Sequence, residues 1–278
     1  MITKAELNLI EITFLGQAGF LFKYGDDSFL IDPYLSNYVV DSGIGSAELF
    51  SRQFPAPLAV TDLKDVKTVF ITHDHGDHCD TDTLIPLYQQ NPHIHFICSK
   101  PAAVHLQSLG VSPDQITIPQ VNHLEHENNF EYYSVPAAHY GFELDAQDNS
   151  YTYLGFVIKV GESWIYHSGD TILYQGMIEQ ILAFTPEIDI ACLPVNGRDG
   201  WRERMGMTGN LDGAEALGLA LQLHADVLIP MHNDVFKVNH VNQATLADLL
   251  DRNAPRQKVH WLQPGEIFYY RKIKKTGA

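Results

Sequence analysis

Cysteine is scarce in this sequence, with only Cys79, Cys98 and Cys192 among 278 residues. An odd number of widely spaced cysteines provides no disulfide framework, so we expect buried thiols in a reducing compartment. Long apolar runs are also missing, and Lys4 and Glu6 stand where a secretory signal needs an apolar segment. We therefore expect a cytoplasmic protein with no membrane partner.

Basic residues are few as well. Eighteen Lys and Arg stand against thirty-four Asp and Glu, which gives a formal net charge of −16 at pH 7. This charge repels polyanions over most of the surface, so nucleic acid is not an expected partner. Part of the negative charge need not lie on the surface, because carboxylates that bind divalent cations are neutralised locally. Histidine, in contrast, occurs fourteen times, an excess that calls for an explanation.

The sequence has neither a Ser/Gly/Pro-rich linker nor a short repeat, and we expect one domain over residues 1–278. Its hydrophobic content of 45% is sufficient for a large core. A meander of strands comes first and strands alternate with helices later, a pattern that indicates an α/β fold. The irregular segment 36–57 is expected to be either a lid over a pocket or a mobile surface insertion.

Apolar and alternating runs mark the expected elements. Strands are predicted at 9–15, 20–24, 28–31, 68–71, 94–98, 130–135, 153–160, 163–167, 188–193, 227–230, 258–262 and 267–270. Helices are predicted at 83–90, 101–109, 171–183, 211–224 and 243–252.

One short segment concentrates residues that bind metals. Residues 72–78, THDHGDH, follow an apolar run and contain His73, His75, Asp77 and His78. Histidines two residues apart can project to one side of the backbone, while the next Asp-His pair turns toward a second position. Imidazole and carboxylate suit zinc or manganese, with iron as an alternative. A solvated loop that caps the following helix is the competing interpretation, and the rest of the chain argues against it.

Three later strand ends each supply one more candidate ligand. His139 follows the run 130–138, Asp170 the run 164–169 and His232 the run 227–231. Two divalent cations held by all these groups would lower the pKa of a shared water toward neutrality. Asp170 suits a bridging position because a carboxylate has two oxygens, and Asp77 suits the acceptance of a proton from that water. We therefore expect catalytic roles for both.

In number and order these residues resemble the metallo-β-lactamase superfamily, whose HxHxDH signature precedes a later His, a later Asp and a last His. The resemblance covers nearly the whole chain and implies a four-layer αββα sandwich with two divalent metal ions at one edge of the facing sheets. It implies support of the ligand loop by Asp32, in the segment LIDP at 30–33. The implied ligands are His73, His75 and His139 for one metal, Asp77, His78 and His232 for the other, and Asp170 for both.

Four segments resemble more closely the L-ascorbate-6-phosphate lactonase-like branch. They are LGQAGF at 15–20, YHSGD at 166–170, GMT at 206–208 and VLIPMH at 227–232. This resemblance implies hydrolysis of a small anionic substrate, most plausibly a phosphorylated sugar lactone or a related ester.

Arginines concentrate in the loop 196–204 of this acidic chain. A guanidinium binds phosphate or carboxylate through two hydrogen bonds, so Arg198 and Arg202 are expected to contact substrate, with Trp201 as a pocket wall. The alternative is that these arginines pair with acidic residues of the same loop.

Two further residues are expected to support the ligands. Asp74, between two ligand histidines, would either accept a ring N–H and fix its tautomer or cap local backbone. His167, three residues before Asp170, is a candidate for support of the site or for substrate contact.

Other functions compete with a lactonase-like hydrolase. A phosphodiesterase of the same superfamily, acting on nucleic acid or phospholipid, is disfavoured by the acidic charge and by the lack of a basic amphipathic helix. A di-iron protein with a redox or sensory role would use the same ligands without hydrolysis. A homo-oligomer is compatible with either.

Overall fold

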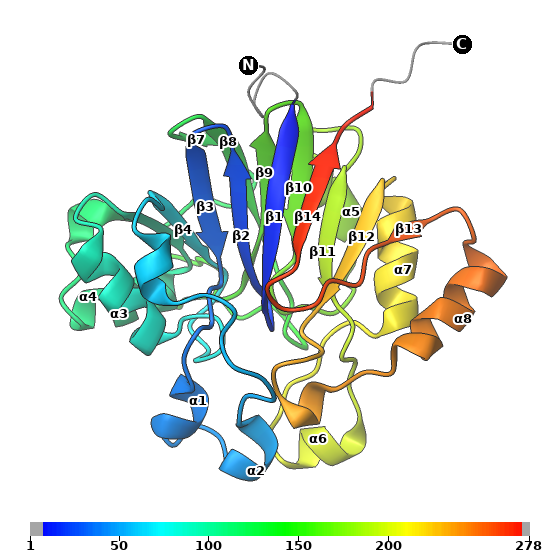
Figure 1. Cartoon of the computed structure of the whole chain (residues 1–278), viewed down its shortest axis with the longest axis horizontal. Helices are drawn as coiled ribbons and strands as arrows, with labels where there is room; N and C mark the ends of the chain where they lie inside the picture. The colour runs from blue at the N-terminus through cyan, green and yellow to red at the C-terminus, as the bar shows by residue number, and fades with distance from the viewer. Residues whose placement is uncertain (1–7, 274–278) are drawn as a thin grey trace.

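The computed structural model of the chain describes residues 8–273, whose strands form two mixed seven-stranded sheets (Figure 1). The first sheet has the order β14-β1-β2-β3-β4-β5-β6. Its strands are β1 (Leu9–Gly16), β2 (Gly19–Tyr24), β3 (Asp27–Ile31), β4 (Thr68–Ile71), β5 (His95–Cys98), β6 (Ile116–Thr117) and β14 (Ile267–Arg271).

The second sheet has the order β13-β12-β11-β10-β9-β8-β7. Its strands are β7 (Glu125–Glu127), β8 (Phe130–Pro136), β9 (Leu154–Val160), β10 (Ser163–His167), β11 (Ile190–Pro194), β12 (Val227–Met231) and β13 (Lys258–Val259).

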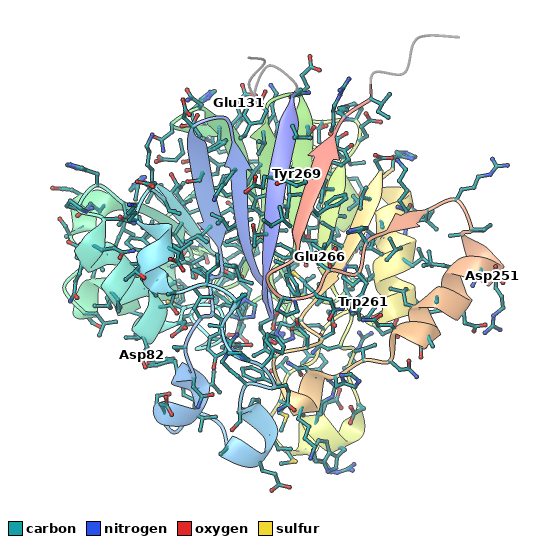
Figure 2. The ribbon with its side chains drawn as sticks, viewed as in Figure 1. Asp82, Glu131, Asp251, Trp261, Glu266 and Tyr269 are labelled. Atoms are coloured by element: carbon teal, nitrogen blue, oxygen red, sulfur yellow. The ribbon has the colours of Figure 1, made fainter. Side chains whose placement is uncertain are left out.

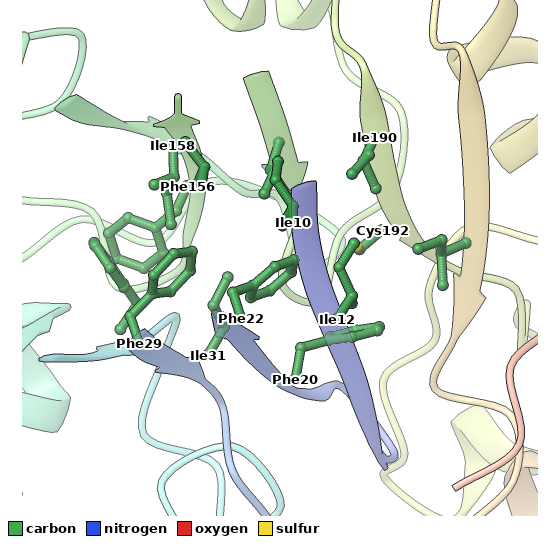
Figure 3. Packing of buried hydrophobic residues seen from close by; sticks show 14 of the residues in the cluster. Ile10, Ile12, Phe20, Phe22, Phe29, Ile31, Phe156, Ile158, Ile190 and Cys192 are labelled. Atoms are coloured by element: carbon green, nitrogen blue, oxygen red, sulfur yellow. The ribbon is translucent and has the colours of Figure 1, made fainter. Parts of the chain in front are cut away.

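The two sheets pack face to face over an aromatic and aliphatic core (Figure 3). Alternate residues of a strand point to opposite faces. In β2, Phe20 and Phe22 therefore enter the core between the sheets, while Leu21 packs against helices on the outside. Phe70 of β4 shows how the layers join, because its ring contacts Phe29 of the same sheet and Phe156 of the other, at centroid distances of 5.5 and 5.1 Å.

Helices cover the outer face of each sheet (Figure 1). Leu84 and Leu106 on α3 (Thr81–Gln90) and α4 (Lys100–Ser108) pack against the first sheet. Ile181 and Leu219 on α5 (Met177–Ile181) and α7 (Gly213–Gln222) pack against the second. The layers are therefore helix, sheet, sheet and helix, and the predicted α/β four-layer sandwich is confirmed.

The remaining helices lie outside these layers. The acidic side chains of Asp82 on α3 and Asp251 on α8 (Gln243–Asn253) are exposed and point outward from the ribbon (Figure 2). Between residues 8 and 273, no helix has the length and apolarity to cross a lipid bilayer. These other helices are α1 (Tyr38–Asp41), α2 (Ala47–Phe50), α6 (Gly200–Arg204), α8 (Gln243–Asn253) and the 3-10 turns η1 (Val60–Leu63), η2 (Pro113–Gln115) and η3 (Lys237–Asn239).

Two predicted elements have less than half of their expected length. The helix predicted at 171–183 is reduced to α5, because Gly176 adopts a left-handed conformation at φ 85° and Ile172 donates its N–H to Ala138 instead. The strand predicted at 258–262 ends at Val259. The segment 36–57 contains the short helices α1 and α2.

Strand direction determines where the functional loops lie. Strands β10, β11 and β12 are parallel, and β9 is antiparallel to both β8 and β10, so β8 runs in the same direction as β10. In the first sheet, β3 and β4 are parallel, and β1 runs the same way because β2 is antiparallel to both β1 and β3. Within each sheet, these strands end at a common edge.

Candidate metal centre

All seven expected ligands converge where strands of the two sheets end. Their ligand atoms form three overlapping groups, and the atoms within each group lie within 4.8 Å of one another. The groups are His73, His78 and Asp170; His75, His139 and Asp170; and Asp77, His78 and His232. The structure therefore brings together histidine and aspartate clusters able to hold metal. His73 groups with His78 and Asp170, whereas the resemblance implies that it shares one metal with His75 and His139.

Asp170 occupies the middle of this arrangement. Its Oδ1 lies 3.3 Å from His78 Nε2, while its Oδ2 lies 3.3 Å from His232 Nε2 and 4.0 Å from His139 Nε2. The carboxylate is buried, with 4% of the residue exposed. Its two oxygens thus face different imidazoles, which is the geometry that a bridging ligand needs.

The loop that carries Asp170 depends on a glycine and a histidine. A Cβ on Gly169, whose φ is 59°, would meet Leu154 O at 2.6 Å, so a larger residue does not fit there. His167 Nε2 donates to Ala18 O at 2.8 Å, and its Nδ1 accepts from Gly169 N at 3.2 Å. Burial lowers the pKa of His167 and favours this neutral form. His167 therefore joins the two sheets beside Asp170.

Asp32 and Thr72 orient two of the imidazoles. Asp32 accepts from Thr72 N at 2.8 Å, Thr72 Oγ1 at 2.7 Å and His78 Nδ1 at 2.7 Å. Since Thr72 Oγ1 donates to Asp32, it accepts from His73 Nδ1, which is 2.9 Å away. Both histidines then carry a proton on Nδ1, so Nε2, which lies toward Asp170, is the atom available to bind metal when it is unprotonated. Asp32 lies in the supporting position that the resemblance implies.

The atoms that face one another in the centre provide a test of whether these residues fit a metal ion. His73 Nε2, His78 Nε2 and Asp170 Oδ1 are all buried and have no hydrogen-bond partner within the described part of the chain. An unsatisfied buried polar atom costs about 1–3 kcal/mol, and a metal ion would satisfy several at once. The donor set of imidazole and carboxylate is also the one that zinc, manganese and iron use. The residues therefore fit a divalent metal.

Gln17, at the turn between β1 and β2, was not predicted as a site residue. Its Nε2 donates to Asp77 Oδ2 at 2.7 Å and lies 3.1 Å from His232 Nε2, while its carbonyl oxygen accepts from His232 N at 2.6 Å. The available signal was the position of a glutamine between Gly16 and Gly19 in a turn joining two apolar strands. Gln17 positions the side chains of one ligand group.

Opposite charges stabilise the metal-free cluster. Burial would raise the pKa of Asp170, but the facing imidazoles of His232 and His78 hold it well below its ordinary value. Burial would lower the pKa of His232, but Asp170 and Asp77 raise it to about 9. The pKa of His78 is likewise raised by carboxylates against the effect of burial, while burial lowers the pKa of His139 to about 4.

These shifts predict pH-dependent metal binding. Below about pH 9, His232 carries an extra proton in the metal-free protein, and the raised pKa of His78 acts in the same direction, so a metal ion must displace protons. Affinity should therefore rise with pH up to about 9, whereas His139 contributes no proton at neutral pH. Calorimetry in buffers of different ionisation enthalpy should detect close to two protons released per protein at about pH 7. Unchanged affinity across this range would contradict the assignment, and His126→Ala, an exposed histidine of β7, is the control.

The arginines expected to contact substrate are already paired. Arg198 donates to Glu215 through Nη1 at 2.7 Å and Nη2 at 2.6 Å. Arg202 donates through Nε to Asp199 Oδ2 at 2.6 Å. Both guanidinium groups are therefore paired, and contact of Arg198 or Arg202 with substrate stays a prediction. The alternative of pairing is observed for both, although the partner of Arg198 comes from α7 and not from its own loop.

The loop 196–204 nevertheless lies close to the metal centre. Tyr140, next to His139, donates its hydroxyl hydrogen to Glu203 Oε1 at 2.7 Å and accepts from Gly209 N at 3.2 Å. Trp201 is half exposed on α6, in the same loop. The position of Trp201 is compatible with a pocket wall, and that role stays a prediction.

Asp74 lies away from the position that its expected role requires. Its side chain is exposed and lines an outer pocket of about 410 Å³ with Lys100, His105 and Asp145. Among the described residues, no hydrogen bond joins it to a ligand histidine, since His73 and His78 use Thr72 and Asp32 instead. The expectation that Asp74 fixes a ligand tautomer is therefore corrected.

The segment 36–57 packs against the metal-binding loop. A Cβ on Gly76 would meet Ile44 Cδ1 at 3.0 Å and Tyr38 at 3.2 Å. Arg52, near the end of the segment, donates from Nη1 to Tyr34 O at 2.8 Å. The segment thus contacts the metal-binding loop at Gly76 and is attached to Tyr34 through Arg52.

Known proteins resemble this chain in sequence and in fold. A curated relative from Pyrococcus furiosus, named UPF0173 metal-dependent hydrolase, is 27% identical over 270 residues, covering 93% of this chain and 98% of the relative. The solved isothiocyanate hydrolase from Delia radicum gut bacteria has 22% identity and a TM-score of 0.71, over 93% of this chain and 98% of that chain. CmlA, a diiron β-hydroxylase from Streptomyces venezuelae, has 16% identity and a TM-score of 0.65, over 95% and 54%. The two structural likenesses concern the fold alone.

The family model described as "Beta-lactamase superfamily domain" matches residues 28–233, which is more than half of the chain and includes every candidate ligand. The two facing sheets, the ligands at their strand ends and this match agree, and the chain belongs to the metallo-β-lactamase superfamily.

Proposed function

We propose that this protein is a hydrolase that holds two divalent metal ions between His73, His75, Asp77, His78, His139, Asp170 and His232. The observation that carries the proposal is the convergence of unpartnered, buried ligand atoms on the two oxygens of Asp170. The relatives support it as well, since those from Pyrococcus furiosus and Desulfitobacterium hafniense are both named metal-dependent hydrolases.

The residues of the chain would divide the work between them. Bound metal ions would supply Lewis acidity and lower the pKa of a coordinated water. Asp170 would join the ligand group that contains His78 to the one that contains His139, because its two oxygens face these two imidazoles. Asp77, whose Oδ2 faces His232 Nε2 at 3.4 Å, would orient the attacking water and accept its proton. Gln17 would keep the Asp77 carboxylate in place by its hydrogen bond.

We propose a small lactone or ester as the substrate, a phosphorylated sugar lactone foremost. The resemblance of residues 15–20 and 227–232 to the lactonase-like branch supports this class, and the net charge of −16 favours a small substrate over a polyanion. The pairing of Arg198 and Arg202 limits how an anionic substrate could bind. An anionic group of the substrate must either displace Glu215 or Asp199 or face the metal ions directly.

Metal analysis and an activity panel together test the proposal. The purified protein is assayed for metal content and electronic spectrum, and then for hydrolysis of sugar lactones, carboxylic esters and phosphodiesters. A colourless zinc or manganese protein that hydrolyses lactones, loses the activity on chelation and regains it with metal is the expected result. Turnover of phosphodiesters alone would replace the substrate class. A coloured iron protein without hydrolysis would overturn the proposal in favour of a di-iron redox or sensory role, which the same ligands suit.

A further inference from the structure

Three buried asparagine side chains form a hydrogen-bonded row behind His232. Asn239 Nδ2 lies 3.2 Å from His232 Nδ1, Asn196 Nδ2 donates to Asn239 Oδ1 at 3.4 Å, and Asn210 Nδ2 donates to Asn196 Oδ1 at 3.2 Å. Asn196 and Asn239 are each 8% exposed, and Asn210 is fully buried. The three come from the end of β11, the segment before α7 and the turn η3.

We propose that this row, named here the asparagine relay (Asn239, Asn196 and Asn210), is a positioning device for His232 as a metal ligand. The inference rests on the proposed metal-binding role of His232. Burying amide groups is unfavourable unless they are hydrogen-bonded, so three in sequence behind one ligand need a compensating function. None of the three touches the reacting atoms, and they act through the imidazole.

The chemistry of a ligand histidine specifies what the relay must do. Nε2 of His232 faces Asp77 and Asp170 at 3.4 and 3.3 Å, so Nε2 is the atom placed to bind metal. It must then be unprotonated, which leaves the ring proton on Nδ1, and a ligand histidine needs an acceptor for that proton. Asn239 is the side chain beside Nδ1, and it must present its oxygen there.

If Asn239 presents its oxygen to His232, the direction of hydrogen-bond donation is reversed along all three asparagines. When Asn239 Oδ1 faces His232, Asn239 Nδ2 donates to Asn196 Oδ1, and Asn196 Nδ2 donates to Asn210 Oδ1. As placed in the structure, Asn210 Nδ2 faces Asn196, and Asn210 Oδ1 is buried with no hydrogen-bond partner among residues 8–273. The Asn210 amide must therefore turn over as well, which gives its oxygen a donor in Asn196 and places its Nδ2 where the unpartnered oxygen was.

The two paired arginines also donate hydrogen bonds to backbone carbonyl oxygens of the relay. Arg202 Nη2 donates to Asn196 O at 2.8 Å, and Arg198 Nη1 donates to Asn210 O at 3.0 Å. Both guanidinium groups thus hold the backbone of a relay residue while pairing with a carboxylate. This gives the arginine-rich loop a role in the geometry of His232 that requires no substrate contact.

Substitutions at Asn239 test the relay, with metal affinity as the first measurement. Calorimetric titration with Zn²⁺ or Mn²⁺ should show that Asn239→Leu, which has no acceptor, weakens binding roughly 10- to 100-fold at the site that contains His232. Asn239→Asp supplies an acceptor by itself and should retain affinity close to that of the unmodified protein. Nitrogen NMR of the imidazole should show the metal-bound Nδ1–H form of His232 in the unmodified protein and in Asn239→Asp, and a smaller fraction of that form in Asn239→Leu at the same Zn²⁺ concentration.

A double-mutant cycle separates positioning from a simple loss of stability. Asn210→Ala should weaken metal binding in the natural background and have little effect in the Asn239→Asp background, because the aspartate no longer needs the relay. Asn253→Asp, on an exposed residue at the end of α8, controls for the added charge. If all Asn239 variants bind metal as the unmodified protein does and show the same imidazole spectrum, the relay is wrong. If the unmodified protein binds no metal at all, the proposed function fails instead.

Discussion

Asp170→Asn is expected to lower the rate of metal-dependent hydrolysis by at least about 10³-fold. Enzymes accelerate reactions by about 10⁶-fold or more, and this acceleration depends on an assembled site. Asp170 belongs to two of the three ligand groups, and its Oδ1 faces His78 of one while its Oδ2 faces His139 of the other. An asparagine has nearly the same shape but carries no charge and offers one oxygen. The two metals would then share no ligand and repel each other with less compensation.

Metal content and activity should be measured together for this variant. We expect the loss of at least one metal ion per protein by elemental analysis, with a fold that circular dichroism shows to be intact. Asp74→Asn is a matched control, because the same chemical change is made on an exposed carboxylate of the neighbouring loop. Full activity and full metal content in Asp170→Asn would remove Asp170 from the centre.

Phe70→Ala is expected to destabilise the protein by about 3–5 kcal/mol, which is large against a total stability of about 5–15 kcal/mol. Phe70 is fully buried and its ring contacts Phe29, Tyr132 and Phe156, so its removal leaves a cavity between the two sheets. It also lies two residues before Thr72, and movement of β4 would displace the metal-binding loop.

Urea unfolding of the metal-free protein measures this loss without a contribution from bound metal. Phe142→Ala, at a phenylalanine that is 46% exposed, should cost about 1 kcal/mol or less and serves as the control. Equal losses at the two positions would show that the interface between the sheets is not the dominant core.

The positions of the candidate ligands could be predicted from sequence because they follow a general rule of strand direction. His139, Asp170 and His232 each come directly after an apolar run, and strands that run the same way bring their following loops to one edge. The layers could be predicted for a related reason. Successive side chains of a strand point to opposite faces of the sheet, and in segments such as 20–22 all of them are apolar. Both faces of the sheet must therefore be covered, one by the other sheet and one by helices.

Contacts that depend on distant pairing could not be predicted in this way. Gln17 carries no charge and belongs to no ligand motif, and its role arises because the turn after β1 lies against the loop after β12. Arg198 pairs with Glu215, on a helix that the sequence did not connect with the arginine loop. Asp74 has the right residue type and spacing, but the direction of its side chain is set by the turn of the loop.

The pairing of β1 with β14 has a consequence for how the protein is made. Residues 9–13 of β1 pair with residues 267–271 of β14. The outer edge of β1 is therefore covered only after β14, the last described strand, has been synthesised. During synthesis that edge presents unpaired backbone groups on a nearly fully buried, apolar strand, which is the kind of surface that pairs with other chains. The nascent protein therefore needs chaperone protection or rapid collapse of the first sheet until residues 267–271 have been made.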